Sequence, residues 1–312
     1  MATTTIPWGD SSGDNIYLTY SSASGDQTVT VSSDANNGAA RQKVITFVST
    51  VGNISRSLTV SQEAGKGPDY LTFTALAAST IGLYNAGGNA PVIYYSINDG
   101  NFTLWDYSSI SLNTGDVVRM YGENGTQLSK SSTIYTRFVM SGSISASGDA
   151  TSLLTERGTN TIGNYCFTYL FQGCSVLTSS PELPAENIGS NCYFQMFNRC
   201  SSLVSAPSIL PSMTLKSGCY RNMFYNCSSL TTAPILPALT LTTNCYAAMF
   251  YGCSSLSYIK AMFTTTPTNS YTADWVNGVN STGTFVKNSS AQWNVVGAYG
   301  VPAGWTIQTA NE

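Results

Sequence analysis

Residues 219–230 read Cys-Tyr-Arg-Asn-Met-Phe-Tyr-Asn-Cys-Ser-Ser-Leu, and residues 245–256 repeat this phrase almost letter for letter. Looser copies begin at Cys192 and at Cys166, and the copy at Cys166 departs most from the others. The first cysteines of the four copies lie 26, 27 and 26 residues apart. Because a self-similar period of this length is typical of solenoids, we expect the four copies to stack as repeats around one continuous core.

Within each copy, the apolar residues are spaced as on one face of a helix. Tyr193, Met196, Phe197 and Cys200 stand at positions i, i+3, i+4 and i+7, which fall on the same side of two helical turns. The other three copies carry the same stripe. We therefore expect a short amphipathic helix in each repeat, with its aromatic side chains stacked in the core.

A short extended segment follows each expected helix. In the first repeat this segment is about Leu177 to Ser180, and we expect it and its equivalents to form a repeating parallel strand. Two prolines come next in three of the repeats, at 181 and 184, 207 and 211, and 234 and 237. Because proline cannot donate a backbone hydrogen bond to a strand ladder, the chain should leave the sheet at these points.

All eight cysteines lie in the repeats, in pairs eight residues apart. Within one helix such a pair would be separated by about 12 Å, which is too far for a disulfide bond. Two alternatives remain: disulfides between adjacent repeats, or free thiols that fill equivalent slots of the core. No metal site is expected, because the spacing is not that of a zinc site and the chain has no histidine.

The composition excludes several classes of protein. Charged residues make up 9% of the 312 residues and the net charge is −3, so the chain lacks the basic excess of a nucleic-acid-binding protein. The absence of histidine removes the commonest general base. No window approaches the roughly 20 apolar residues of a membrane helix. The first residues have neither the basic nor the apolar segment of a secretory signal peptide.

Residues 1–65 form the first expected domain. Four runs alternate β-branched or aromatic residues with polar ones, at 16–20, 28–32, 43–48 and 57–62. Turn-forming residues separate them at 24–26, 36–38 and 52–53. The pattern predicts a small antiparallel β-sandwich, followed by a linker at 65–68.

Residues 66–140 form a second expected β domain, with strand-like runs at 70–75, 92–97, 117–121 and 135–141. Residues 97–102 indicate a tight turn with positive φ at Asn98, Asp99 or Gly100 rather than a calcium loop. We expect residues 138–144 to supply the first parallel strand of the solenoid and so to cap it.

Residues 141–312 form the expected solenoid domain, and the repeat decays after Ser257. We expect a strand at 258–263, a short helix at 271–276 and a last strand at 284–287. Solenoids need a terminal cap, and Trp275, Trp293 and Trp305 are candidates for it. The alternative is an exposed tryptophan platform for a sugar.

Two parts of the chain resemble known families. The phrase Cys-Tyr-x-x-Met-Phe-Tyr-x-Cys-Ser-Ser-Leu resembles the BspA-like leucine-rich repeats of surface proteins and phage structural proteins of gut Bacteroidales, over roughly residues 160–312. Residues 25–31 and 58–64 resemble the BACON module, an immunoglobulin-like domain of the same bacteria and their phages. The resemblances imply a multidomain, mainly β chain with an immunoglobulin-like β-sandwich, a second small β domain and a leucine-rich-repeat (α/β) solenoid. They also imply adhesion by the repeats, and either carbohydrate binding or a spacer role for the module.

No catalytic constellation stands out. Enzymes need acid, base or nucleophilic groups that converge, whereas the carboxylates here are scattered and no catalytic motif occurs. We expect a non-enzymatic protein without a cofactor. Solenoids bind partners through the variable positions of their repeats. Here the candidate ligand-binding residues are Phe194, Gln195, Arg199, Arg221, Asn222, Tyr225 and Tyr251.

The resemblances and the missing signal peptide together favour a virion protein. We expect a fibre, tail or head-decoration component on the virion surface of a phage of gut Bacteroidales, which binds a glycan or a host-surface protein. Other virion proteins would be further partners, and the chain could form a homo-oligomer. The alternative is an adhesin or lipoprotein on the surface of the bacterium itself. Neither nucleic acid nor membrane insertion is expected.

Overall fold

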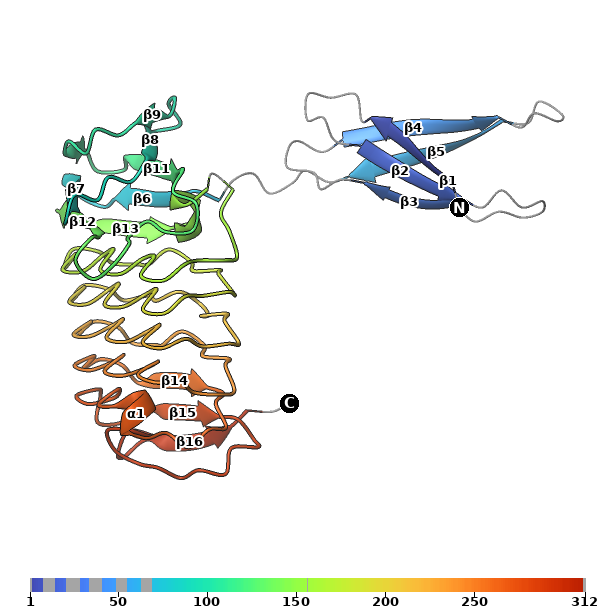
Figure 1. Cartoon of the computed structure of the whole chain (residues 1–312). Helices are drawn as coiled ribbons and strands as arrows, with labels where there is room; N and C mark the ends of the chain where they lie inside the picture. Colours follow the sequence, from blue (N-terminus) through green and yellow to red (C-terminus); the bar gives the residue numbers. More distant parts are fainter. Residues whose placement is uncertain are drawn as a thin grey trace. The chain divides into compact units, whose positions relative to one another are not determined.

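The computed structural model describes residues 2–7, 15–20, 29–33, 41–48, 55–62, 69–155 and 157–310. The chain divides into two compact units, Met1–Pro68 and Asp69–Glu312. The described residues are mainly β, as the sequence predicts. Their helices are limited to α1 (Asn269–Thr272) and a 3₁₀ helix, η1 (Ala150–Leu153) (Figure 1).

The first unit consists of two antiparallel sheets, one with the order β1-β2-β3 and the other pairing β4 with β5. The strands are β1 (Ala2–Pro7), β2 (Asn15–Tyr20), β3 (Val29–Ser33), β4 (Arg41–Val48) and β5 (Ser55–Gln62). Ile16, Leu18 and Ile45 come from both sheets and are buried in one small apolar cluster. The sequence predicts four of these strands and misses β1. The predicted turns at 24–26, 36–38 and 52–53 and the predicted linker lie outside the described residues.

The second unit opens with eight strands in two antiparallel sheets, with the orders β10-β7-β12 and β13-β6-β11-β8-β9. The strands are β6 (Leu71–Ala75), β7 (Ser79–Asn85), β8 (Ile93–Ile97), β9 (Thr103–Leu104), β10 (Ile110–Leu112), β11 (Val117–Gly122), β12 (Thr136–Ser141) and β13 (Ile144–Ser147). Strands β6, β8, β11 and β12 match the predicted runs. The sequence does not predict the other four strands, which include β7, the longest of the eight.

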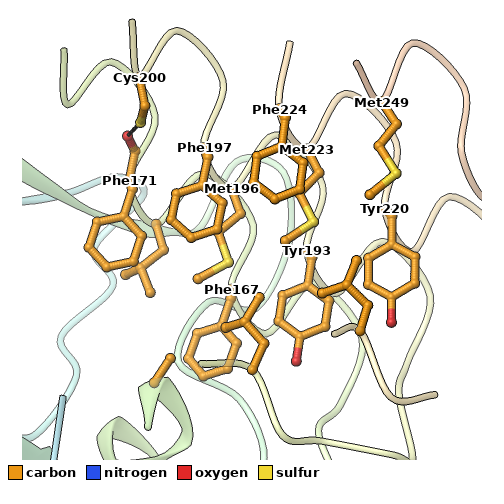
Figure 2. Close-up of a cluster of buried hydrophobic side chains, with 14 of the residues drawn as sticks. Phe167, Phe171, Tyr193, Met196, Phe197, Cys200, Tyr220, Met223, Phe224 and Met249 are labelled. Carbon is orange, nitrogen blue, oxygen red and sulfur yellow. Dashed lines mark hydrogen bonds between the residues drawn. The ribbon is translucent and has the colours of Figure 1, made fainter. Parts of the chain in front are cut away.

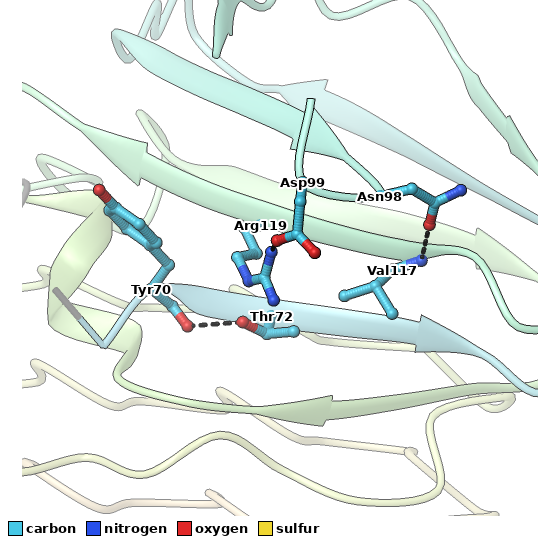
Figure 3. A network of polar contacts seen from close by, with 6 residues as sticks. All are labelled: Tyr70, Thr72, Asn98, Asp99, Val117 and Arg119. Carbon is cyan, nitrogen blue, oxygen red and sulfur yellow. Dashed lines mark hydrogen bonds and ion pairs between the residues drawn. The ribbon is translucent and has the colours of Figure 1, made fainter. Parts of the chain in front are cut away.

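The turn that follows β8 is held by polar contacts (Figure 3). Asn98 and Asp99 have φ of 49° and 61°, at two of the three positions that the sequence indicates. Asn98 Oδ1 accepts a hydrogen bond from Val117 N at 2.9 Å, and the Asp99 carboxylate forms an ion pair with Arg119. The turn prediction is therefore confirmed.

Beyond these sheets the chain winds into stacked coils (Figure 1). We number the coils 1 to 4 from their first cysteines, Cys166, Cys192, Cys219 and Cys245, and we call the nine residues from the first to the second cysteine of a coil its turn segment. Every turn segment consists of turns, not helix. The predicted helices at these positions are therefore wrong.

Backbone hydrogen bonds explain why these segments are not helical. Met196 N donates to Tyr193 O of its own segment at 3.1 Å, whereas the next amide, Phe197 N, donates to Met223 O of the following coil at 2.9 Å. This alternation continues along each segment. About half of the amides thus pair within the coil and half with the next coil, so the coils are joined by backbone as well as by side chains.

A residue with positive φ stands at every fourth position and closes each turn. In coil 2 these residues are Asn191, Gln195 and Arg199, and Gly218, Asn222 and Asn226 follow the same rule in coil 3. A period of four and the helical period of 3.6 bring nearly the same residues to one face over only nine residues. The apolar stripe therefore identifies the buried face correctly but not the backbone conformation.

Two ladders of aromatic rings fill the core of the coils (Figure 2). Phe171, Phe197, Phe224 and Phe250 stack with centroids 5.2, 5.4 and 5.7 Å apart and interplanar angles below 10°. A parallel ladder contains Phe167, Tyr193, Tyr220 and Tyr246. The predicted aromatic core is therefore confirmed.

The predicted parallel strand is present only as isolated bridges. One row joins Ile144 to Leu177, Ser179 to Ser205, Ser205 to Thr232 and Thr232 to Tyr258. A second row, which includes Ile209 paired with Ile235, lies between the two prolines of a coil. The prediction that the chain leaves its neighbour at the prolines is therefore wrong: the first proline interrupts the pairing, and the chain pairs again before the second.

The two sheets formed by β6 to β13 share one core with the coils. Phe138 of β12 donates its N–H to Leu170 O of coil 1 at 2.8 Å, and its ring stacks on Phe171 at 5.3 Å. Ile144 of β13 pairs in parallel with Leu177. Residues 138–144 therefore lead into the stack, but not as the single parallel strand that we expected. They span the end of β12 and the start of β13, which pair antiparallel with β7 and β6, and the parallel pairing to coil 1 is the isolated bridge at Ile144. We expected residues 66–140 and 141–312 to be separate domains, but residues from 69 onward belong to one compact unit.

The C-terminal end is closed by a parallel sheet of β14 (Tyr258–Ala261), β15 (Thr284–Lys287) and β16 (Thr306–Thr309). The short helix lies at 269–272 rather than at the predicted 271–276. Trp275, Trp293 and Trp305 are 0, 4 and 7% exposed. Each indole N–H donates to a backbone carbonyl, of Gly300, Phe263 and Asn280 respectively. The cap prediction is confirmed, and the alternative of an exposed sugar platform is wrong.

The shared core predicts which fragments of the chain can fold. We expect a fragment of residues 69–312 to unfold cooperatively, because it keeps the whole core. A fragment of residues 141–312 loses Phe138 and β6, exposes the end of the phenylalanine ladder and should be unfolded or aggregated. Circular dichroism with thermal melting of both fragments checks this. A cooperative melt of the 141–312 fragment at the temperature of the longer one would contradict it.

The tyrosine ladder offers a stabilising substitution. The hydroxyl groups of Tyr193 and Tyr220 are buried and have no hydrogen-bond partner among the described residues, whereas coil 1 carries Phe167 at the same place. Tyr220→Phe should raise the free energy of unfolding by about 1 kcal/mol, because it removes an unsatisfied buried polar group. Tyr299→Phe at an exposed tyrosine is the control. Denaturant unfolding measures both, and a loss of stability in Tyr220→Phe would refute the interpretation.

Candidate functional site: a polar pocket on the turn segments

The nine residues of a turn segment divide between a buried and a more exposed set. Positions 1, 2, 5, 6 and 9 are buried in every coil. Positions 3, 4, 7 and 8 are half-buried or exposed, except for the buried Thr168, Asn198 and Ala247. We call the surface formed by these four positions the turn face. All seven predicted ligand-binding residues belong to it: Phe194, Gln195, Arg199, Arg221, Asn222, Tyr225 and Tyr251.

An open pocket of about 500 Å³ lies on the turn face. Its lining residues are Arg137, Gln172, Gly173, Gln195, Asn198, Arg199, Asn222 and Tyr225. Gln195, Arg199, Asn222 and Tyr225 of the predicted set therefore come together in one place. Phe194, Arg221 and Tyr251 lie on the same face and do not line the pocket.

An amide network forms part of the pocket wall. Gln172 Nε2 of coil 1 donates to Gln195 Oε1 of coil 2 at 2.7 Å, and Asn198 Nδ2 donates to the same oxygen at 3.3 Å. Because Gln195 has positive φ, its side chain leaves the segment at the corner of a turn. The network fixes three amide groups in a pocket that a ligand can enter.

Arg137 also lines the pocket, and it comes from β12 in the sheets that precede coil 1. Its guanidinium carbon lies 5.0 Å from the centroid of the Tyr84 ring, and Nη1 is 3.4 Å from Gln172 O. Its Nε is buried, with no hydrogen-bond acceptor among the described residues. The ring contact holds the guanidinium in place and leaves much of its donor capacity unused.

Arg199 occupies a position that favours glycine. Its φ is 63°, and the equivalent residues in coils 1 and 4 are Gly173 and Gly252. A side chain in this left-handed conformation costs about 1–2 kcal/mol, although Arg199 N still donates to Tyr225 O at 2.7 Å. The side chain is exposed. The fold therefore carries an arginine here at some cost to stability.

Tyr225 provides the aromatic wall of the pocket. Its ring stacks on Tyr251 of coil 4, with centroids 4.7 Å apart and an interplanar angle of 3°. Coils 1 and 2 carry the shorter Gln172 and Asn198 at the same position. The face of Tyr225 that is turned toward coil 2 is therefore not covered by a ring and lines the pocket.

A second aromatic row runs along the turn face beside the pocket. Tyr135, Tyr169 and Phe194 are in edge or tilted contact, at 4.7 and 5.4 Å, and the Arg221 guanidinium lies 5.7 Å from the Phe194 ring. Burial and then Tyr135 raise the pKa of Tyr169, and the charge of Arg221 opposes this. Phe194 and Arg221 are thus engaged with each other at the flank.

The pocket residues that the sequence analysis misses have identifiable causes. Arg137 is far from the repeats in sequence, and only the fold brings it to coil 1. Gln172 and Asn198 occupy the position of Tyr225 in their own coils. Aligning all four copies by outward position, instead of selecting conspicuous side chains, would have found them.

The lining of the pocket offers hydrogen bonds and ring contacts. Among the described residues that line it, none is an aspartate, a glutamate, a cysteine, a serine, a threonine or a lysine. Amide, guanidinium and phenol groups donate and accept hydrogen bonds and form ring contacts. No group of three histidine, cysteine or acidic side chains in the described ranges could hold a metal ion. No described helix is long and apolar enough to span a bilayer.

No family model, no curated protein and no solved structure matches this chain.

The cysteines form two buried rows and no disulfide bond. In the second row Cys200, Cys227 and Cys253 donate their S–H to a phenylalanine carbonyl of the preceding coil at 3.0 to 3.1 Å. Of the two alternatives left open by the sequence, the structure has free thiols in the core.

Burial predicts how these thiols affect stability. It raises the pKa of Cys166, Cys174 and Cys253 from 9.0 to about 12. Between pH 9 and 12 the unfolded chain therefore loses thiol protons while the folded chain keeps them. The free energy of unfolding should be constant from pH 7 to 8 and should fall as the pH rises above 9, by about 1.4 kcal/mol per pH unit for each buried thiol.

Denaturant midpoints measured from pH 7 to 11 check this dependence, and Cys253→Ala should show a shallower decline by the share of one thiol. A thiol reagent at pH 8 should label the native chain only as fast as it unfolds. Rapid labelling of all eight cysteines in the native state, or a midpoint that stays constant up to pH 11, would contradict the burial.

Proposed function

We propose that this chain is a non-enzymatic adhesion protein that binds a saccharide in the pocket on its turn face. The observation that carries the proposal is the uncovered face of Tyr225 beside a wall of fixed amide groups. Saccharides are bound by an aromatic ring that contacts the apolar face of the sugar, together with planar polar groups that bond its hydroxyls. The pocket combines both.

The biological setting of the proposal comes from the resemblances. Resemblance to BspA-like leucine-rich repeats and to the BACON module supports a virion fibre, tail or head-decoration protein of a phage of gut Bacteroidales. The alternative is an adhesin on the bacterial surface. In either setting, the coil stack displays the pocket, and the first unit serves as an immunoglobulin-like spacer.

A glycan array with the full-length chain tests the proposal. We expect a defined set of saccharides to bind, and we expect Tyr225→Ala to weaken this binding about tenfold, which corresponds to about 1.4 kcal/mol. Tyr299→Ala, at a tyrosine of the C-terminal cap that is 42% exposed, should leave binding unchanged. Residues 69–312 alone should bind as the full chain does.

Three results would count against this assignment. Binding that survives Tyr225→Ala would move the site away from the pocket. Binding that requires residues 1–68 would assign it to the first unit. The absence of any bound saccharide would leave the chain as a structural component.

A further inference from the structure

The pocket contains positive charge without a compensating carboxylate. Arg137 and Arg199 both line it, and no acidic side chain is among the described lining residues. In the part of the chain that the structure describes, neither arginine forms an ion pair, whereas Arg119 does so with Asp99. The sequence has no aspartate or glutamate between Glu186 and Asp274. Coils 2 to 4 therefore contain no acidic side chain, and Glu182 and Glu186 of coil 1 do not line the pocket.

The pocket is positively charged, whereas the whole chain has a net charge of −3. Two guanidinium groups at one pocket repel each other, and an anion placed between them relieves that repulsion. Arginine is suited to such an anion, because its planar fork binds the oxygens of a carboxylate or a sulfate in pairs. Arg137 is already oriented by its contact with Tyr84.

Arg199 adds an independent argument. It stands in a left-handed backbone position that coils 1 and 4 fill with glycine, and its exposed side chain has no packing role that would explain the choice. The charge of Arg199 at the mouth of the pocket is the property that glycine would lack.

The other lining residues indicate the kind of molecule to which the anionic group belongs. The Tyr225 face requires a ring that can lie against it, and Gln172, Gln195 and Asn198 offer amide groups to hydroxyls. We propose that the pocket binds an anionic sugar, with its ring against Tyr225 and its carboxylate or sulfate group at Arg137 and Arg199. This proposal rests on the proposed saccharide-binding function and specifies the class of ligand.

The test compares charged and neutral forms of one saccharide by calorimetry on the full-length chain. The probes are an oligosaccharide of hexuronic acid, its carboxyl-reduced neutral form and the sulfated form of that neutral sugar. We expect at least tenfold tighter binding of one or both charged forms than of the neutral form. The preference between the two charged forms identifies which anion the pocket takes.

Arg199→Gly is the decisive variant, because it gives coil 2 the residue that coils 1 and 4 already have and should not lower stability. It should reduce affinity for the charged form about tenfold and should leave affinity for the neutral form unchanged. Arg137→Lys keeps the charge but loses the planar fork. It should lower the affinity for the charged form by less than Arg199→Gly does. Lys216→Ala removes one exposed positive charge of coil 3 outside the pocket, and it should have no effect.

Three outcomes would overturn the inference. Equal affinity for charged and neutral forms, lost only in Tyr225→Ala, would leave a neutral-sugar site and would keep the proposed function. An equal loss in Arg199→Gly and Lys216→Ala would show general charge attraction without a specific site. Failure of every saccharide to bind would remove the proposed function and this inference together.

Discussion

The hydrogen bonds between successive turn segments determine the rest of the coil stack. Because every second amide of a segment donates to the following coil, equivalent residues of neighbouring coils are held directly above one another. This register places ring on ring in the core, with the rings of the phenylalanine ladder almost parallel. It also places outward residue beside outward residue on the turn face. The core and the turn face therefore follow from one backbone constraint.

The ends of the stack show what this constraint requires. An amide that donates to the next coil needs a next coil, so a last segment would present unpaired donors and an uncovered ring. At the C-terminal end, Ala273 O and Trp275 O accept the bonds of coil 4 from Ala248 N and Phe250 N. Trp275 also covers the tyrosine ladder. At the N-terminal end of the stack, Phe138 of β12 extends the phenylalanine ladder. The sheets of β6 to β13 and the coils therefore form one unit.

The sequence predicts many of the strands, the repeat and the buried face, because each leaves a periodic apolar pattern, but it misses β1 and the strands β7, β9, β10 and β13. It does not predict the backbone of the turn segments, since nine residues are too few to separate a period of four from 3.6. The signal was present in another form: Asn191, Gly218 and Asn244 precede equivalent cysteines, and glycine or asparagine recurs near the end of three turn segments, at Gly173, Asn226 and Gly252. The variable positions located the turn face, but Arg137 could be assigned to the pocket only through the fold.

The strict register also limits how such a chain can change in length during evolution. All four turn segments contain nine residues, whereas the distance between the second cysteine of one coil and the first of the next varies by one. An inserted residue within a turn segment would shift every later amide to the wrong acceptor. The stretch between the second cysteine of one coil and the first cysteine of the next accommodates an extra residue. Gene variants that add or remove whole coils would keep every bond paired. The stack can therefore lengthen or shorten in units of one repeat, and each new unit brings four outward positions on which a different specificity can be selected.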